Sequence, residues 1–357
     1  MIAVGGPPPP AALVNEVLAL GVIPTRDLAA PGISVVDASV SHRSFEVRVG
    51  ESPKVFVKCE SPMRSFGRRL STEVAVYRLA ASSPELAGVV PRCLGIVRAD
   101  TVIVLEAVPG TPLSASPLAY GEMDISDQPA SSRMILYGYG RAVARVHRVQ
   151  APPLGYPPWL LSALEPGWGG YDWLPWPCRE LLLELAAQPS MRRSFARVAA
   201  SWHPTALVHG DLRWANVLAE PGTGNPKLWL VDWELAFVGD PAWDVGCVLA
   251  DLLGAAAAKA VNESTPPPDL WEAAHAFLAG YRSVAAPAPQ EWRGLIQRSV
   301  ALTGIRLVQT LLEYGYDGAH LLPSMKPILL PWSALLLSEP PALVNELAGS
   351  GRSECGC

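Results

Sequence analysis

The hydrophobic pattern of this chain changes at Pro109-Gly110, and that change constrains the fold more than any other feature of the sequence. Before the break, apolar and polar residues alternate over short segments separated by turn residues, which is typical of β-strands. After the break, apolar residues mostly recur three and four positions apart, which is typical of helices. The sequence therefore predicts a small sheet-rich region followed by a larger, mainly helical one.

The sheet-rich region contains five predicted strands and one predicted helix. The strands cover residues 33–36, 44–49, 55–58, 95–98 and 101–106. The helix covers residues 70–80, between the third and fourth strands, and Ser71 or Thr72 can cap its N-terminus. Later helices are predicted over residues 135–149, 270–281 and 299–314, with short strands at 207–209, 217–219 and 228–233.

Size and charge exclude two classes of partner. The chain has 357 residues, which fits one large domain or two packed domains. Its 28 basic and 33 acidic residues give a net charge of −5 without a long basic run, so no nucleic-acid partner is expected. The apolar stretch 327–338 has about half the length of a membrane span, so no membrane partner is expected either.

Cysteine usage indicates the compartment. The six cysteines form neither a CxxC pair nor a disulfide framework, so we expect a reducing, cytoplasmic location. The N-terminus holds four consecutive prolines and no basic segment, so a signal peptide is not predicted. Cys355 and Cys357 end a polar tail that we expect to be flexible rather than to bind a metal.

The strongest chemical signal is a cluster of polar residues late in the chain. Asp211 and Asn216 follow His209, and Asp232 comes 16 residues after Asn216, at the end of an apolar segment. Phosphoryl transfer requires a carboxylate beside the attacking hydroxyl and oxygen ligands that hold Mg²⁺ against the nucleotide phosphates. Asp211 suits the first role, and Asn216 and Asp232 suit the second.

These residues carry a family resemblance. The run His209-Gly-Asp-Leu-Arg-Trp-Ala-Asn216 resembles the H-x-D-L-x-x-x-N catalytic loop of protein kinases, and its opening resembles the aminoglycoside phosphotransferase and choline kinase branch. Asp232-Trp-Glu234 and Gly239-Asp-Pro-Ala-Trp-Asp244 are similar to two further segments of that branch. The resemblance, which covers about residues 30–320 in element order, implies that Asp244 begins a helix and anchors the catalytic loop.

The resemblance also implies a fold and its domains. The fold class is α+β: a bilobal protein-kinase-like fold, whose N-lobe is an antiparallel five-stranded sheet with one helix and whose C-lobe is mainly helical. We expect an N-terminal extension (residues 1–30), an N-lobe that binds the nucleotide (31–108), a C-lobe with the catalytic loop and acceptor site (109–348) and a flexible tail (349–357).

By the same resemblance, the N-lobe binds ATP. Lys58 ends Val55-Phe-Val-Lys58, at the place of the third-strand lysine of kinases, and would contact the α- and β-phosphates. Glu73, 15 residues later in the predicted helix, would pair with this lysine. The backbone from Glu106 to Val108 would form the hinge that hydrogen-bonds the adenine edge.

The chain departs from kinases at the loop expected to cover the phosphates. Residues 37–44, between the first two strands, contain no glycine, which elsewhere permits close backbone approach. Ser39 and Ser41 can offer hydroxyl groups to the phosphates instead, as can Ser44. Arg43 either adds charge there or lies in an exposed turn.

Four further residues of the C-lobe have expected roles, and only Arg213 has two alternatives. Arg213, two residues after Asp211, either neutralises charge in the transition state or is a surface arginine. We expect His209 to pack within the loop rather than to act as a base, His147 to be a buried hydrogen-bonded residue, and Trp243 to lie in the core.

The acceptor is read from residues 151–178, which are rich in proline and tryptophan. Residues 151–200 carry four acidic and four basic side chains, so a polycationic aminoglycoside is not the expected substrate. Tryptophan faces suit an apolar ligand or a quaternary ammonium group, as in a choline-type substrate. The alternative is that these tryptophans fill a loop-rich core.

Three functions remain open from the sequence. The first is an ATP- and Mg²⁺-dependent phosphotransferase that acts on a hydroxyl of a small metabolite or antibiotic. The second keeps this chemistry but phosphorylates Ser or Thr of a precursor peptide in a lanthipeptide-type natural-product pathway, where a partner lyase performs the elimination. The third is a non-catalytic nucleotide-binding pseudokinase, which the glycine-free loop motivates.

Overall fold

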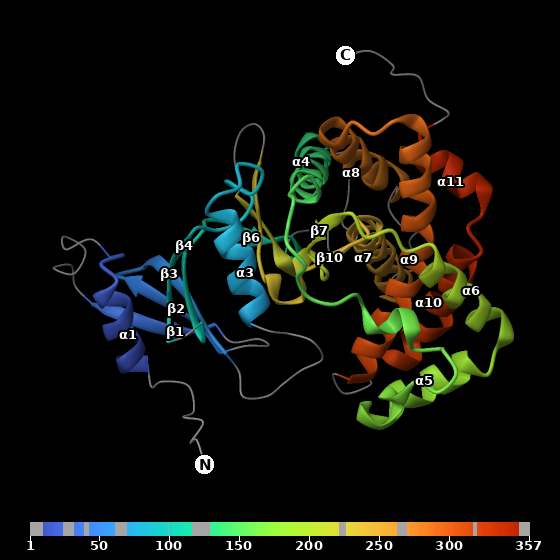
Figure 1. Ribbon diagram of the computed structural model, residues 1–357, viewed down its shortest axis with the longest axis horizontal. Helices are drawn as coiled ribbons and strands as arrows, with labels where there is room; N and C mark the ends of the chain where they lie inside the picture. Colours follow the sequence, from blue (N-terminus) through green and yellow to red (C-terminus); the bar gives the residue numbers. More distant parts are fainter. Residues whose placement is uncertain are drawn as a thin grey trace. The chain divides into compact units, whose positions relative to one another are not determined.

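The structure is a computed structural model, and two compact units make up the chain (Figure 1). Unit 1 comprises residues 1–110 together with Trp229–Ala236, and unit 2 comprises residues 111–228 and 237–357. The residues that the structure describes are 10–23, 32–38, 43–60, 70–98, 100–115, 129–220, 226–262, 270–316 and 320–349.

Unit 1 contains a five-stranded sheet in the order β1-β2-β3-β5-β4. Its strands are β1 (Ile33–Asp37), β2 (Arg43–Val49), β3 (Ser52–Cys59), β4 (Cys93–Val97) and β5 (Val102–Glu106). Every neighbouring pair is antiparallel. The predicted strands and the antiparallel five-stranded sheet are therefore confirmed.

Two helices cover opposite faces of this sheet. Helix α1 (Pro10–Ala19) buries Leu13 and Val17 against a cluster that includes Val57 of β3. Lys58, the next residue of β3, points to the other face because side chains alternate along a strand. There it meets Glu73 of α3 (Leu70–Ala80), and Figure 1 shows the sheet between α1 and α3.

Unit 1 includes two segments that lie outside the predicted N-lobe, residues 31–108. The sequence predicts that residues 1–30 are an extension, whereas α1 forms part of the core of this unit. Residues Trp229–Ala236 also belong to unit 1, and the Leu230 amide donates a hydrogen bond to the Val89 carbonyl (2.7 Å). Trp233 is fully buried there, and its indole donates to the Leu230 carbonyl.

Unit 2 is mainly helical. Its helices are α4 (Pro129–His147), α5 (Trp176–Ala186), α6 (Pro189–Ala200), α7 (Ala242–Asn262), α8 (Leu270–Ala285), α9 (Pro289–Tyr316), α10 (Leu322–Leu337) and α11 (Pro341–Leu347). Short strands accompany them: β10 (Phe237–Gly239) pairs with β7 (Ala206–Val208), and β6 (Thr111–Pro112) pairs with β8 (Val217–Glu220). Strand β9 (Lys227–Leu230) belongs to the same sheet as β6 and β8, and its last two residues are counted with unit 1. The predicted α+β class is confirmed.

The structure contains helices that the sequence pattern missed. Helices α5 and α6 lie in or next to the Pro- and Trp-rich segment, and each has a proline in its first turn, where helices tolerate it. Helix α9 begins at Pro289, ten residues before the predicted start at Ser299. Glu291 explains that start, because its carboxylate accepts the Ala288 amide in the manner of a capping box.

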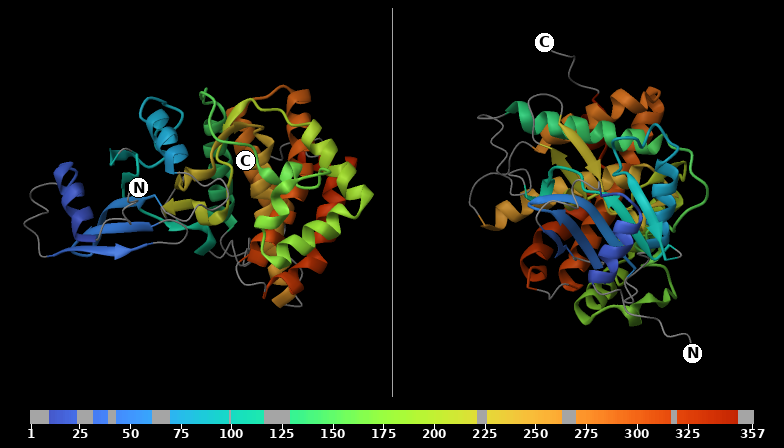
Figure 2. Two further views of the ribbon diagram at one scale, coloured as in Figure 1. Left: turned by 60° about the horizontal axis from the view of Figure 1, so that its bottom comes forward. Right: turned by 90° about the vertical axis from the view of Figure 1, so that its left-hand side faces the viewer.

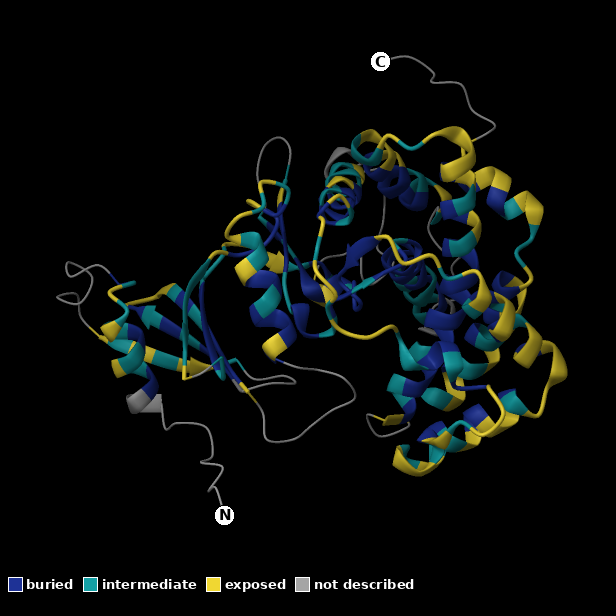
Figure 3. Cartoon of the chain, viewed as in Figure 1, coloured by how far each residue is buried: buried dark blue, intermediate teal, exposed yellow. Residues whose placement is uncertain are grey.

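The core of unit 2 lies between α7, α9 and α10 (Figure 3). A side chain on Gly246 of α7 would lie 3.1 Å from the Thr303 amide nitrogen, and one on Gly304 of α9 would lie 2.9 Å from the Ser333 carbonyl oxygen. Glycines therefore bring α9 close to both neighbouring helices.

Among the described residues, no single helix is long and apolar enough to cross a membrane. Helices α10 and α11, which are bent by 88° relative to each other, pass that test as a pair by length and composition.

Glycines also fix the crossing of α4 and α8, which lie side by side in the views of Figures 1 and 2. A Cβ on Gly140 would lie 1.9 Å from the Phe277 carbonyl oxygen, and one on Gly280 would lie 1.9 Å from the Tyr137 carbonyl oxygen. Both neighbours are backbone atoms, so neither can move without shifting a helix.

We predict that Gly140→Ala lowers the free energy of unfolding by about 3 kcal/mol, the upper end of overpacking costs, because the helices must separate. The matched control is Gly254→Ala in α7, where a Cβ meets nothing within 4 Å. This control should be neutral or should stabilise by up to about 1 kcal/mol, since alanine favours helix. Urea unfolding followed by circular dichroism measures both changes, and equal effects of the two substitutions would contradict the prediction.

Candidate active site

The lysine at the end of β3 lies in a buried ion-pair cluster of unit 1. Lys58 Nζ donates to both carboxylate oxygens of Glu73 (3.0 and 2.9 Å) and lies 2.5 Å from Asp232 Oδ1. Burial by itself would lower the pKa of Lys58, but the Glu73 and Asp232 carboxylates raise it above its ordinary value. Lys58 is therefore a fixed positive charge held between two carboxylates.

Asp232 is placed by an unusual backbone conformation. Its φ of +70° lies in the left-handed region, which aspartate adopts more readily than most residues. The short 3-10 helix Trp233–Leu235 follows directly, with Trp233 and Glu234 buried. The bend therefore turns the Asp232 carboxylate toward Lys58 while the next residues anchor the chain in unit 1.

The loop from His209 to Asn216 lies in unit 2 and is held by the first turn of α7. Asp244 accepts hydrogen bonds from the backbone amides of His209 (2.8 Å) and Gly210 (3.0 Å). Trp243 donates its indole N–H to the Gly210 carbonyl. Gly210 has a φ of +87°, so only glycine fits this position without strain.

His147 of α4 completes this anchor. Its Nε2 lies 3.1 Å from Asp244 Oδ2, and its Nδ1 lies 2.8 Å from the Tyr281 hydroxyl. The predictions for Asp244 as a loop anchor and for His147 as a buried hydrogen-bonded residue are confirmed. His209 is also buried, and its Nδ1 accepts the Asp211 amide (3.4 Å), as expected of a residue that packs within the loop.

Asn216 is oriented by Asp211. Its side-chain nitrogen donates to the Asp211 backbone oxygen (2.8 Å) and lies 3.4 Å from the carboxylate oxygen Oδ2. The amide oxygen of Asn216 therefore points away from Asp211. An amide oxygen fixed in this way is a donor that suits Mg²⁺, which prefers oxygen ligands.

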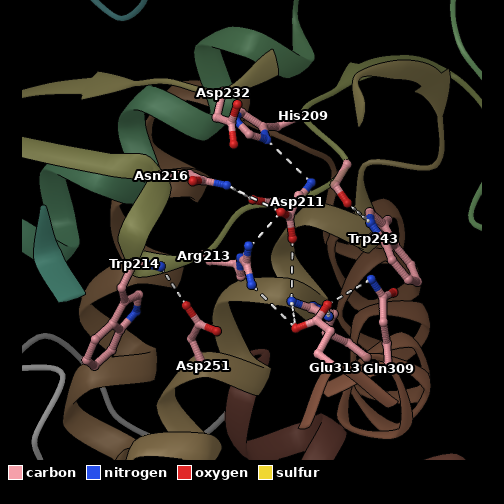
Figure 4. A network of polar contacts seen from close by, with 12 residues as sticks. His209, Asp211, Arg213, Trp214, Asn216, Asp232, Trp243, Asp251, Gln309 and Glu313 are labelled. Atoms are coloured by element: carbon pink, nitrogen blue, oxygen red, sulfur yellow. Dashed lines mark hydrogen bonds and ion pairs between the residues drawn. The ribbon is translucent and has the colours of Figure 1, made fainter. Parts of the chain in front are cut away.

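The Asp211 carboxylate contacts two arginines, one of which, Arg213, is labelled beside it in Figure 4. Arg213 Nε is 3.3 Å from Oδ2, and Nη2 of Arg306, on α9, is 3.5 Å from Oδ1. Glu313, one further residue of α9, accepts hydrogen bonds from both arginines. The charge of Asp211, opposed by burial, raises the pKa of Arg213 above its ordinary value, so the two form a charged pair.

A second carboxylate of α7 holds the other end of the loop. Asp251 accepts the Trp214 amide (2.7 Å), which begins the 3-10 turn that contains Asn216. Burial raises the pKa of Asp251 to about 7, although Arg306, the Trp214 hydrogen bond and Arg213 act in the opposite direction. Asp244 and Asp251 are seven residues apart, so both project from the same face of α7.

The comparison with protein families decides what this site belongs to. The family described as the phosphotransferase enzyme family matches residues 32–265, which is more than half of the chain and includes every residue of the Lys58 cluster and of the His209–Asn216 loop. The chain belongs to this family. The sequence-based predictions of the family and of phosphotransferase activity are confirmed, whereas no curated protein matches the chain significantly.

Solved structures show that this phosphotransferase shares its fold with small-molecule kinases. An ethanolamine kinase from Plasmodium vivax is 12% identical with a TM-score of 0.54, over 95% of this chain and 91% of that chain. A microcompartment-associated aminopropanol kinase is 17% identical with a TM-score of 0.51, over 91% and 95%. The choline kinase LicA from Streptococcus pneumoniae is 14% identical with a TM-score of 0.50, over 92% and 100%. The predicted protein-kinase-like fold is confirmed.

The structure describes the backbone of the predicted hinge but not the serines predicted to contact the phosphates. The Glu106 amide of this phosphotransferase donates to Arg92 and the Ala107 amide to Lys54. An adenine contact therefore stays a prediction for the Glu106 carbonyl and the Val108 amide. Ser39 and Ser41 lie outside the described residues.

Sequence reasoning missed three polar residues of the loop environment: Asp251, Arg306 and Glu313. It also assigned Trp243 only to the core, although this side chain donates to the loop as well. The signal available for Arg306 is a charged residue between Ile305 and Leu307, in a helix segment that is otherwise buried and mostly apolar.

We predict that Asp251 makes the stability of the phosphotransferase depend on pH. Its folded-state pKa of about 7 exceeds the ordinary value of 3.8, so the folded state binds more protons than the unfolded state between about pH 4 and pH 7. This contribution to stability is complete below about pH 4 and is lost as the pH rises to about 7.

Asp251→Asn should therefore flatten the decline of the melting temperature over this range. The matched control is Asp172→Asn, which changes an 82% exposed side chain and should leave the pH dependence as in the wild type. Differential scanning fluorimetry at a series of pH values measures both. Parallel profiles for Asp251→Asn and wild type would disprove the prediction.

Proposed function

We propose that this phosphotransferase transfers the γ-phosphate of ATP, with Mg²⁺, to a hydroxyl group of a small molecule. The observation that carries the proposal is the His209–Asn216 loop. Its Asp211 carboxylate is held at a fixed place by three side chains, and the Asn216 side chain is oriented by the same aspartate. This arrangement is what positioning of an attacking hydroxyl requires.

We assign the nucleotide to Lys58 and the metal to Asn216 and Asp232. Lys58 offers a permanent positive charge to the α- and β-phosphates, and Glu73 keeps the ammonium in place. The carboxylate of Asp232 and the amide oxygen of Asn216 are both hard oxygen donors and fit Mg²⁺. When bound, the metal neutralises charge on the phosphates, which is its usual part in phosphoryl transfer.

Asp211 accepts the proton of the acceptor hydroxyl. As the hydroxyl O–H bond breaks, the acceptor oxygen bonds to the γ-phosphorus, and the bond to the β-phosphate oxygen breaks to release ADP. Arg213 is 32% exposed, so it can reach from Asp211 toward the transferred phosphate and neutralise its charge. The chain carries all four polar residues expected of an active kinase, which disfavours the pseudokinase alternative: Lys58, Asp211, Asn216 and Asp232.

The acceptor is a small hydroxylated metabolite or antibiotic. The ethanolamine, aminopropanol and choline kinases that share the fold support an alcohol as the acceptor class. The Trp-rich segment adjoins the catalytic region through α9, because Cys178 of α5 donates to the Leu312 carbonyl, next to Glu313. Trp173 and Trp176 are 73% and 66% exposed, which supports an apolar or quaternary-ammonium group on the acceptor.

Nucleotide binding is tested first. Wild-type protein should melt at a higher temperature with ATP and Mg²⁺, because a ligand that binds the folded state stabilises it. Lys58→Met and Asp232→Ala should lose this shift. Lys326→Met is the control, since Lys326 pairs with Glu184 on the surface and should keep it. A full shift in Lys58→Met would contradict the nucleotide assignment.

Chemistry is tested with an acceptor screen that measures ADP release. Amino alcohols, choline, macrolides, aminoglycosides and Ser/Thr peptides are the candidate acceptors. With the acceptor that responds, Asp211→Asn should lower kcat by about 10²–10⁴-fold, because a positioned base is removed. Asp100→Asn, an exposed change in unit 1, should leave kcat unchanged.

The same screen separates the remaining alternatives. Response to a peptide alone favours the lanthipeptide-type function, and a lyase gene next to a short precursor gene supports it further. A response to small alcohols favours the principal proposal. Undiminished transfer in Asp211→Asn would overturn the catalytic assignment. We retain a cytoplasmic location, without a nucleic-acid or membrane partner, as part of this proposal.

A further inference from the structure

Arg306 is a fully buried arginine in contact with Asp211 to which the proposed chemistry assigns no task of its own. Its side chain is 2% exposed, in the middle of α9. A guanidinium group is costly to bury unless it is paired, so its partners determine why it is there. Burial by itself would lower the pKa of Arg306, but Glu313 and Asp211 raise it above its ordinary value.

The partners of Arg306 connect α9 to the catalytic aspartate. Nη1 donates to Glu313 Oε1 (2.7 Å), and Nη2 lies 3.5 Å from both Glu313 Oε2 and Asp211 Oδ1. Glu313 also accepts from Gln309 (3.2 Å) and Arg213 (3.4 Å). Arg306 and Glu313 are seven residues apart, so they lie on one face of α9, and Glu313 sets the direction of the guanidinium group.

The backbone that carries Arg306 is itself firmly placed. Gly304 lies against α10, where the Ser333 hydroxyl donates to its carbonyl (2.8 Å), and the neighbouring Thr303 packs against Gly246 of α7. Because α9 can shift toward neither helix, Arg306 provides a fixed point beside the loop. Arg213 differs, because its side chain is 32% exposed.

We propose that Arg306 is a positioning residue that fixes the Asp211 carboxylate by holding Oδ1, so that Oδ2 receives the proton of the acceptor hydroxyl. Arg213 Nε and the Asn216 side-chain nitrogen both face Oδ2 in the structure, and in this proposal a movement of Arg213 toward the phosphate gives the acceptor hydroxyl access to that oxygen. Arg306 holds the other oxygen throughout. The inference rests on the proposed function, because it assigns a task to Asp211.

The test compares Arg306→Met with Arg298→Met, using the acceptor found in the screen. Arg298 is the matched control, because it lies eight residues earlier on α9 and pairs with Asp240 (2.7 Å), away from Asp211. We expect Arg306→Met to lower kcat about 10²-fold, as expected for a misplaced catalytic group, with an unchanged KM for ATP. Arg298→Met should lower the melting temperature but keep kcat, expressed per folded molecule.

Chemical rescue separates positioning from a purely structural role. Arg306→Ala leaves a cavity beside Asp211, so guanidinium ion at millimolar concentration should restore part of its kcat. The same ion should not raise kcat of Arg298→Ala. If Arg306→Ala does not fold, a double-mutant cycle with Arg306→Met and Glu313→Gln replaces it, and the two effects on kcat should be less than additive because both act through one contact.

The outcomes also distinguish this inference from the proposed function. If Asp211→Asn abolishes transfer while Arg306→Met keeps kcat within about twofold of wild type, well short of the expected loss, the positioning role is wrong and the proposed function stands. A loss of kcat in Arg306→Met that is not coupled to Glu313→Gln, together with no guanidinium rescue of Arg306→Ala, also overturns it. If Asp211→Asn leaves transfer unchanged, the proposed function itself fails.

Discussion

The buried Asp244 carboxylate accepts hydrogen bonds from two backbone amides, and the conformation of the His209–Asn216 loop depends on this contact. Asp244 is fully buried, so its charge is stable only because the His209 and Gly210 amides and His147 surround it. The same hydrogen bonds hold Gly210 in its left-handed conformation, which directs the chain toward Asp211. The burial of Asp244 in unit 2 and the geometry of the loop therefore depend on the same hydrogen bonds.

Two helices hold the loop, and each does so with two charged side chains. Helix α7 presents Asp244 and Asp251 to backbone amides, and α9 presents Arg306 and Glu313 to side chains. The two residues of each pair are seven positions apart, so their side chains lie on the same face of the helix. Because α7 and α9 pack through Gly246, the backbone contacts and the side-chain contacts share one rigid support.

Local patterns and the family resemblance predicted the strands of the large sheet, several helices and part of the site. Alternation predicted all five strands of the large sheet, and the resemblance to kinases predicted the pairing of Lys58 with Glu73, which the structure brings into contact. Prolines concealed α5 and α6, although a proline in the first turn is compatible with a helix. Arg306 was missed because its partner Asp211 is 95 residues away. A buried arginine predicts a carboxylate partner, but only the packing of α9 determines which one.

The assignment of Trp229–Ala236 to unit 1 has a consequence for how the chain folds during synthesis. Neither unit is a continuous piece of sequence, because the chain leaves unit 1 at Gly110, returns at Trp229 and leaves again after Ala236. The ribosome must therefore synthesise more than half of the protein before Asp232 and Trp233 can pack into the unit that contains Lys58. A fragment that ends at Gly110 lacks both residues, so unit 1 cannot be isolated by a single truncation.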